Sequence, residues 1–235
     1  MLEETPVPDL ARVWADLGGT RVTRCRLRRS WATWGIVVAA VLTVALAVAG
    51  LAATKDGRSA ERTGASSQLL EALATLPVAA EEARSGYARD LFPHWDDADD
   101  DGCNTRCEVL ADQRRPDGLW LSAWDGYSTD DPDELQVDHV VALAEAWDSG
   151  AAGWSAARRD AFADDPANLL AVTASSNLRK GDKDAAEWFP SRAEANCLWA
   201  STVVRVKQRW DLSVDHAEAI AIGNLLRTCA DGGDH

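Results

Sequence analysis

The chain has 235 residues, of which 46% are hydrophobic and 11 are tryptophan, so it is long and apolar enough to bury a sizeable core. Its formal charge of −14 argues against a basic nucleic-acid-binding surface, because phosphate contacts normally rest on clusters of Lys and Arg. The acidic excess is concentrated in the C-terminal part: residues 87–235 carry 14 basic and 29 acidic side chains, whereas residues 1–86 carry 10 and 9.

Residues 31–54 form an uncharged run of 24 residues, and about 20 apolar residues cross a bilayer as a helix. Arginines are concentrated on its N-terminal side, and Trp31 and Trp34 occupy the position of an interfacial aromatic belt. The pattern predicts a single-pass signal anchor in the cell membrane, with residues 1–30 as a cytoplasmic basic segment and an extracellular C-terminal domain. No polar face interrupts the run, which disfavours a buried soluble helix.

A cleaved signal peptide is the alternative for this N-terminal segment, and the protein would then be secreted. Ala47-Val48-Ala49 resembles the small-residue site at which signal peptidase cuts. The polar lead of roughly 30 residues and the full-length apolar run favour the anchor. Residues 55–68 are small and polar, which predicts a linker before a folded domain at residues 69–235.

Several elements are expected along that domain. Leucines at helical spacing predict a helix that starts near Leu69 and is stopped by Pro77. Strands are expected where β-branched residues gather, and Ser175 or Ser176 can cap a short helix holding Asn177 and Lys180. The other predicted elements are strands at 135–141 and 169–172 and helices at 87–95, 142–149, 155–162, 191–210 and 215–229.

An acidic loop at residues 97–108 follows the calcium-loop pattern of acidic residues at positions 1, 3 and 5, Gly at 6 and Glu at 12. The pattern predicts a structural calcium ion, and a solvated acidic turn is the alternative in so acidic a chain. The predicted ligands are Asp97, Asp99, Asp101 and Glu108.

The cysteines indicate an oxidising compartment. Four of the five follow the apolar run, and an even number in an exported domain suggests disulfides. Cys197 and Cys229 lie on the two terminal helices and are a reasonable pair; the pairing of Cys103 and Cys107 stays open. A zinc site is a weak alternative, because no second Cys or Cys/His cluster completes four ligands.

The main chemical signal lies between residues 138 and 182. Asp138 and His139 end a predicted strand, and Asn168 and Asn177 flank the apolar run 169–172. These residues and Lys180 supply a metal ligand, a base and its orienter, as needed for metal-assisted phosphodiester hydrolysis. A histidine at a strand end is by itself more often structural; the asparagines and the lysine in register favour the catalytic interpretation.

The pair Asp215-His216 serves as an internal control. It begins a predicted helix, and Asp215 with Glu218 forms a capping box. Capping explains this second Asp-His pair fully, because no strand flanked by asparagines follows it.

The sequence resembles the HNH (His-Me finger) nucleases, specifically the C-terminal domain family of GmrSD-type restriction endonucleases in an exported, actinobacterial-like form. The resemblance covers roughly residues 69–229. It departs from the family pattern at Ala142, where Pro is common, and at Cys107, where a polar residue is expected. The matching motifs are Gly86-Tyr87-x-Arg89, Gly102-Cys103-x-Thr105-Arg106, Val137-Asp138-His139-Val140-Val141, Glu145-Ala146-Trp147, Asn168-Leu169-Leu170-Ala171-Val172, Asn177-x-x-Lys180-Gly181-Asp182 and Trp188-x-Pro190.

This resemblance implies an α+β fold: a ββα-metal (His-Me finger) core embedded in a mostly helical domain, here preceded by one transmembrane helix. It implies His139 as the general base, Asn168 as the residue that positions it, and Asp138 and Asn177 as ligands of one divalent metal. Lys180 matches a basic position beside the site. Oxygen ligands of this kind suit Mg²⁺ or Mn²⁺.

We therefore expect a metal-dependent endonuclease that hydrolyses nucleic acid, DNA more than RNA. The alternative is a non-catalytic, calcium-stabilised extracellular binding or envelope module on an HNH scaffold, which the net charge favours. A metallopeptidase ranks last, since no His-Glu-x-x-His pattern occurs. Protein partners are not indicated by the sequence.

Overall fold

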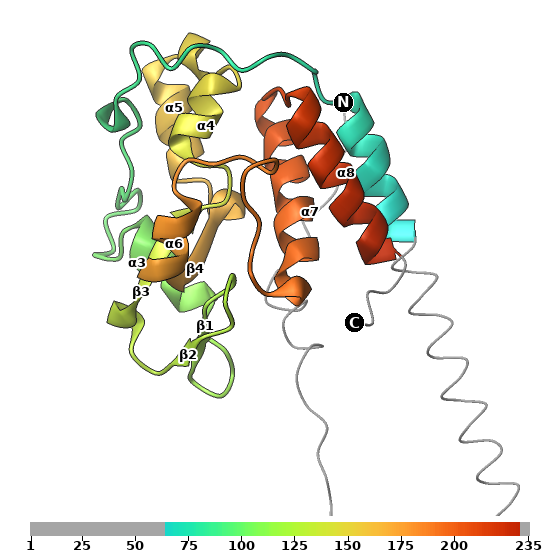
Figure 1. The fold of residues 1–235 in the computed structure, drawn as a ribbon. Helices are drawn as coiled ribbons and strands as arrows, with labels where there is room; N and C mark the ends of the chain where they lie inside the picture. The colour runs from blue at the N-terminus through green and yellow to red at the C-terminus, as the bar shows by residue number, and fades with distance from the viewer. Residues whose placement is uncertain (1–63, 231–235) are drawn as a thin grey trace, which may run out of the picture. The chain divides into compact units, whose positions relative to one another are not determined.

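A computed structural model describes residues 64–230. The predicted basic segment 1–30, the predicted transmembrane helix 31–54 and most of the predicted linker 55–68 lie outside the described residues. Within residues 64–230, none of the helices combines the length and the apolar character that a membrane crossing requires. The described part is a mixed α+β unit with two small sheets (Figure 1).

The centre of the unit is an antiparallel pair of strands followed by a helix. Strand β3 (Leu135–His139) pairs with β4 (Leu169–Thr173), so that His139 lies opposite Leu169 and Leu135 opposite Thr173. Helix α6 (Ala174–Lys180) follows β4 directly. Its cap is the Thr173 side chain, which accepts the Ser176 N–H, and not Ser175 or Ser176 as predicted. The predicted order of strand, insert, strand and helix is confirmed.

The insert between the two strands is helical. It contains α4 (Leu143–Asp148), a 3-10 turn (Ala151–Gly153), α5 (Ala156–Ala163) and a second 3-10 turn (Pro166–Asn168). Ser155 caps α5 by accepting the Arg158 N–H. The insert therefore leaves the hairpin at His139 and returns to it at Asn168.

One face of the hairpin packs on α3 (Thr105–Asp112) and on a second sheet of two short strands, β1 (Trp120–Leu121) and β2 (Ser128–Thr129). Strand alternation explains which side chains face this core, since Leu135 and Val137 are buried while Gln136 between them is exposed. The buried cluster comprises Val109, Leu110, Trp120, Leu135, Val137, Leu169 and Ala171.

Two long helices complete the unit: α7 (Ala193–Trp210) and α8 (His216–Ala230). The disulfide Cys197–Cys229 joins them, as predicted, and a second disulfide joins Cys103 to Cys107. Asp215 caps α8 by accepting the Glu218 N–H at 2.7 Å, which confirms the role given to this Asp-His pair.

Two predictions differ more than the others from the structure. Residues 64–68, predicted as linker, already belong to the helix that continues to residue 75. The helix predicted at 87–95 is only a 3-10 turn at Arg89–Leu91, because Pro93 cannot continue a helix.

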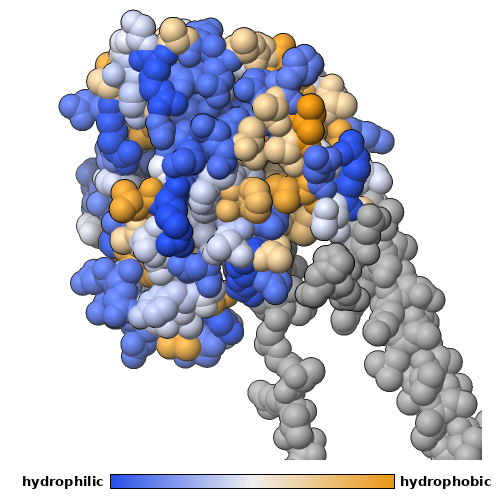
Figure 2. Space-filling model, in the orientation of Figure 1, coloured by the Kyte–Doolittle hydropathy of each residue, from blue (hydrophilic) through white to orange (hydrophobic). Residues whose placement is uncertain are grey.

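The outer face seen in Figure 2 is mainly hydrophilic, as the high charge content predicts.

Candidate functional site

His139 is held at the end of β3 by a carbonyl from the insert. Its Nε2 lies 2.7 Å from the Ala163 oxygen at the end of α5. A carbonyl can only accept a hydrogen bond, so Nε2 carries the hydrogen and Nδ1 keeps a free lone pair. No described residue forms a hydrogen bond with Nδ1. This is the tautomer that a general base requires.

Burial keeps this imidazole uncharged. The His139 residue is 4% exposed, and its removal from water lowers the pKa to about 3. The bond to Ala163 opposes that shift, while the charges of Lys180 and Arg89 add to it. His139 is therefore neutral at physiological pH, with an unprotonated Nδ1.

Asn168 forms no hydrogen bond with the imidazole, so it does not orient the ring directly as predicted. Its Oδ1 accepts the Val141 N–H at 2.8 Å, and its Nδ2 donates to the Val141 oxygen at 3.1 Å. The Asn168 backbone oxygen also accepts the Val140 N–H. Asn168 thus fixes the chain just after His139 and positions the base only indirectly.

Asp138 and Lys180 form a buried ion pair. Lys180 Nζ lies 3.0 Å from Asp138 Oδ1 and also donates to the His139 backbone oxygen at 2.7 Å. The Trp124 indole N–H donates to the other Asp138 oxygen at 3.1 Å. Lys180 is fully buried and Asp138 nearly so, so each depends on the other for charge compensation.

Asn177 extends from α6 toward the same strand. Its Nδ2 donates to Gln136 Oε1 at 2.8 Å, and among the described residues no side chain or N–H donates to its Oδ1. Lys180 and Asn177 therefore both face β3 from α6. His139, whose neighbours in the strand point the other way, contacts α5.

The donor chemistry here fits a divalent metal. Asn177 Oδ1 is a free amide oxygen, and each Asp138 oxygen accepts one hydrogen bond and keeps a second lone pair. Both are the hard oxygen ligands that Mg²⁺ and Mn²⁺ prefer. The Lys180 ammonium shares Asp138 Oδ1, so a metal would compete with it for that carboxylate.

A second group beside His139 was not predicted as part of the site. His94 and Trp95 lie with ring centroids 6.0 Å and 5.8 Å from His139. The exposed Arg89 reaches His94 Nε2 at 3.4 Å. The only sequence signal for this group was Arg89 in the matching motif at residues 86–89.

The backbone at Trp95 is unusual. Its φ of 71° lies in the left-handed region, which a bulky side chain rarely adopts. The Asp164 carboxylate holds this conformation by accepting the Trp95 and Asp96 N–H groups. Asp164 follows α5, so the element that binds His139 also fixes the aromatic ring beside it. Strain of this kind concentrates at functional sites.

The acidic loop is only partly assembled as predicted. Carboxylate oxygens of Asp97, Asp99 and Asp101 all lie within 4.8 Å of one another. Asp97 also accepts the Asp101 and Gly102 N–H groups, which shapes the turn. Glu108 lies on α3 and is not part of this group.

A two-stranded hairpin with His139 at the end of its first strand and a helix after its second defines the class: an α+β domain with a ββα unit. Residues 95–225 match the family of GmrSD restriction endonucleases, C-terminal domain, and the chain belongs to this family. It is also 37% identical over 169 residues to an uncharacterized secreted protein of Arthroderma benhamiae, covering 67% of this chain and 82% of that protein. No solved structure matches. The family indicates a nuclease-type function in general terms.

Acid should destabilise the fold through His139. The pKa of about 3 in the folded chain lies below the ordinary value of about 6.5 expected after unfolding. Stability from the neutral imidazole is therefore complete above pH 6.5 and is lost as the pH falls toward 3, because the unfolded chain binds the proton first. We expect this to cost about 2 kcal/mol between pH 7.5 and pH 5.

Urea unfolding of the wild type and of His139→Gln at both pH values checks this prediction. The wild type should lose about 2 kcal/mol more than the variant, which cannot titrate. The exposed His216→Gln is the matched control and should follow the wild type. Equal losses in the wild type and His139→Gln would contradict the buried neutral imidazole.

Proposed function

We propose that this chain is a metal-dependent endonuclease that hydrolyses phosphodiester bonds of nucleic acid, DNA more than RNA. The observation that carries the proposal is the neutral His139, whose Nε2–H is committed to Ala163 and whose Nδ1 is free. A free imidazole nitrogen at neutral pH can take the proton of an attacking water. The family membership of residues 95–225 supports the same chemistry.

Each residue of the site has a separate proposed role. His139 Nδ1 accepts the proton of the water whose oxygen attacks phosphorus, and the bond to Ala163 keeps the ring oriented while it becomes an imidazolium. Asn168 acts as a positioning residue through Val141. Asp138 and Asn177 would hold one Mg²⁺ or Mn²⁺, which supplies positive charge to offset that on the leaving oxygen.

The positive charges near His139 come from Arg89 and Lys180. Arg89 is exposed beside His94, and Lys180 is buried behind Asp138. We infer that Arg89 contacts the phosphate backbone, while Lys180 holds Asp138. With so few cations, substrate affinity should be modest and should depend only weakly on salt.

An extracytoplasmic location fits this proposal. Two disulfides occur in the described residues, and disulfides persist in oxidising compartments. The relative from Arthroderma benhamiae is a secreted protein. We propose that the domain acts outside the cytoplasm, either anchored by residues 31–54 or released by cleavage near Ala49.

The non-catalytic binding module remains the second candidate, and one observation favours it. His139 is 4% exposed and both Asp138 oxygens are already paired, so substrate and metal must reach a largely closed site. On this alternative, the same residues are a structural network.

Plasmid nicking by the full chain with Mg²⁺ or Mn²⁺ distinguishes the two candidates. Removal of the general base in His139→Ala should lower the cleavage rate by about 100-fold or more. His216→Ala, in the other Asp-His pair, is the matched control and should cleave as the wild type does, and a chelator should abolish cleavage. Wild-type cleavage rates in His139→Ala would exclude His139 as the base.

We also propose that the acidic loop binds calcium through Asp97, Asp99 and Asp101. Calcium should then raise the melting temperature, because a ligand that binds only the folded state stabilises it. Asp99→Asn should remove the loop's share of that rise, while Asp100→Asn, outside the group of three, should keep it. Thermal melts at increasing calcium check this, and equal rises in the two variants would refute a calcium site in the loop.

A further inference from the structure

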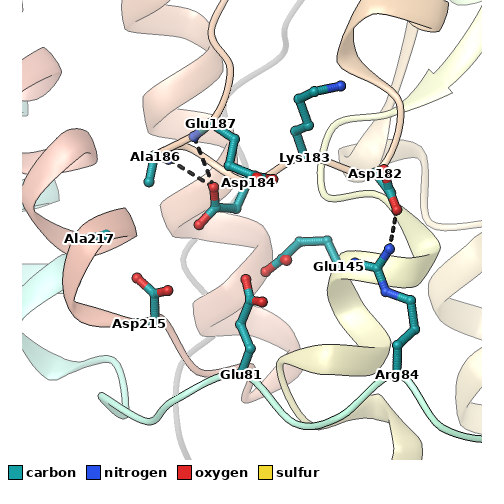
Figure 3. Close-up of a pocket in the computed structure, with 10 residues that line it drawn as sticks. All are labelled: Glu81, Arg84, Glu145, Asp182, Lys183, Asp184, Ala186, Glu187, Asp215 and Ala217. Atoms are coloured by element: carbon teal, nitrogen blue, oxygen red, sulfur yellow. Dashed lines mark hydrogen bonds and ion pairs between the residues drawn. The ribbon is translucent and has the colours of Figure 1, made fainter.

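A second acidic centre lies in a cavity that the proposed nuclease site does not use. The cavity has a volume of about 470 Å³ and is lined by α4, the loop after α6, the start of α8 and the extended segment after residue 76 (Figure 3). Six of its lining residues are carboxylates: Glu81, Glu145, Asp182, Asp184, Glu187 and Asp215.

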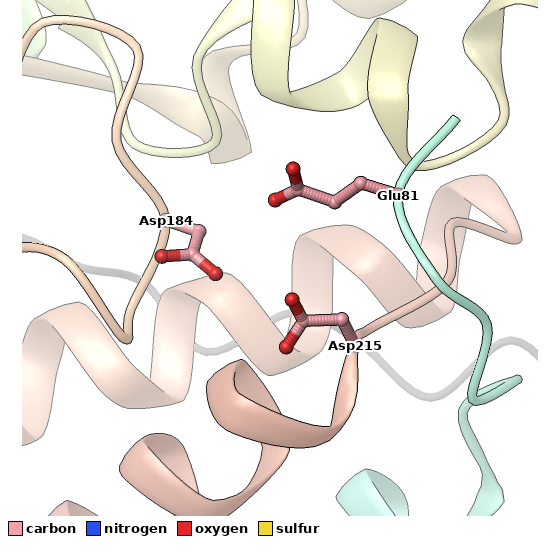
Figure 4. A group of neighbouring side chains, drawn as sticks. All are labelled: Glu81, Asp184 and Asp215. Atoms are coloured by element: carbon pink, nitrogen blue, oxygen red, sulfur yellow. The ribbon is translucent and has the colours of Figure 1, made fainter. Parts of the chain in front are cut away.

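Three of these carboxylates come close together. Oxygens of Glu81, Asp184 and Asp215 all lie within 4.8 Å of one another, and Figure 4 shows the three side chains pointing toward a common space. They come from segments more than 30 residues apart in the sequence, so the tertiary fold creates the group. Like charges at this spacing repel one another unless something neutralises them.

Glu145, outside this group of three, gives a second indication of a ligand. Glu145 is 3% exposed, and its Oε1 accepts bonds from Ser149 and Lys207. Among the described residues, nothing donates to Glu145 Oε2, and the carboxylate faces the other acids in Figure 3. Polar side chains that are nearly buried normally have partners for their polar atoms. An unpaired oxygen that such a side chain directs at a cavity therefore indicates a place for a ligand.

Asp184 shows the same pattern. It is 6% exposed, and its Oδ1 accepts the Ala186 and Glu187 N–H groups. No described residue donates to its Oδ2. Two nearly buried carboxylates thus each present one unpaired oxygen to the same cavity.

The cations nearby already have partners. Lys207 is shared between Glu145 and Glu218, and Lys183 donates to backbone oxygens. Arg84 pairs with Asp148 and Asp182. Burial, followed by the charge of Glu145, raises the pKa of both Glu81 and Asp184. Acids therefore outnumber cations in the cavity lining, where six carboxylates face only Arg84 and Lys183.

We propose that this cavity binds one hard divalent cation of the calcium type, with Glu81, Asp184 and Asp215 as ligands and Glu145 Oε2 as a fourth. All the donors are carboxylate oxygens, which such cations prefer. The grouped oxygens lie within 4.8 Å of one another, close enough to contact one ion. Calcium takes many carboxylate oxygens, whereas magnesium usually keeps several waters and only one or two carboxylates, so four carboxylates suit calcium.

Such an ion would add to the existing links among three segments, which include the Ala79–Val214 hydrogen bond and the Arg84–Asp182 ion pair. It would join the segment carrying Glu81, the loop that follows α6, and the start of α8 at Asp215. The loop begins at Gly181, directly after Lys180, so the ion would hold the C-terminal helices against the ββα unit.

Calcium titration of the full chain by equilibrium dialysis tests this proposal. The chain should carry Asp99→Asn, so that the acidic loop does not contribute. We expect about one ion per chain with a dissociation constant no weaker than about 1 mM, the range of extracellular calcium sites. Adding the Glu81→Gln substitution to the Asp99→Asn chain should raise the calcium dissociation constant at least tenfold.

Glu187→Gln is the matched control, because Glu187 is an exposed acid that lines the same cavity but does not belong to the group of three. It should bind calcium as the Asp99→Asn chain does. Glu81 is exposed and has no side-chain hydrogen bond among the described residues, so Glu81→Gln should fold normally, as circular dichroism can verify. Asp184→Asn is a second variant that removes a proposed calcium ligand.

Two results would overturn the proposal: no calcium bound by the Asp99→Asn chain at about 10 mM, ten times the weakest expected constant, or equal affinities in Glu81→Gln and Glu187→Gln. Both readouts are independent of nucleic-acid cleavage. A failure of the nuclease proposal would therefore leave this result unaffected.

Discussion

The hydrogen-bonded contact between Asn168 and Val141 is the constraint on which the candidate site depends. The Asn168 side chain binds both backbone groups of Val141, and its own oxygen accepts the Val140 N–H. These bonds bring the two ends of the helical insert together at the point where β3 stops. They therefore place Ala163 against His139, and a single carbonyl then determines which imidazole nitrogen is free.

Charge compensation organises the rest of the interior. Lys180 and Lys207 are both fully buried, and each is surrounded by carboxylate and carbonyl oxygens. A buried charge without a partner would cost several kcal/mol, so each lysine fixes the elements that supply its partners. Lys180 joins α6 to β3, whereas Lys207 joins α7 to α4 and α8. In the acidic cavity, the buried lysines do not compensate the charge of all the carboxylates.

Much of the fold could be predicted from the sequence, because it depends on local patterns. The β-branched run ending at His139, the helix cap at Asp215 and the pairing of Cys197 with Cys229 follow from spacing and residue type. The short turn near Arg89 was predicted as a longer helix, although Pro93 was visible.

The polar contacts of the site could not be predicted in the same way. Asp138, Asn168 and Lys180 were identified as site residues, but their partners depend on where α5 and α6 pack. The Ala163 carbonyl carries no side-chain signal at all. The acidic cavity was missed for the same reason, since its members are distant in sequence and meet only in the folded chain.

The measurement that most directly tests the account is a nitrogen-15 NMR titration of the His139 ring in the folded chain. The account predicts a neutral ring with the hydrogen on Nε2 from pH 8 down to pH 5, because burial lowers the pKa to about 3. A hydrogen on Nδ1, or protonation with a midpoint near the ordinary value of about 6.5, would contradict it.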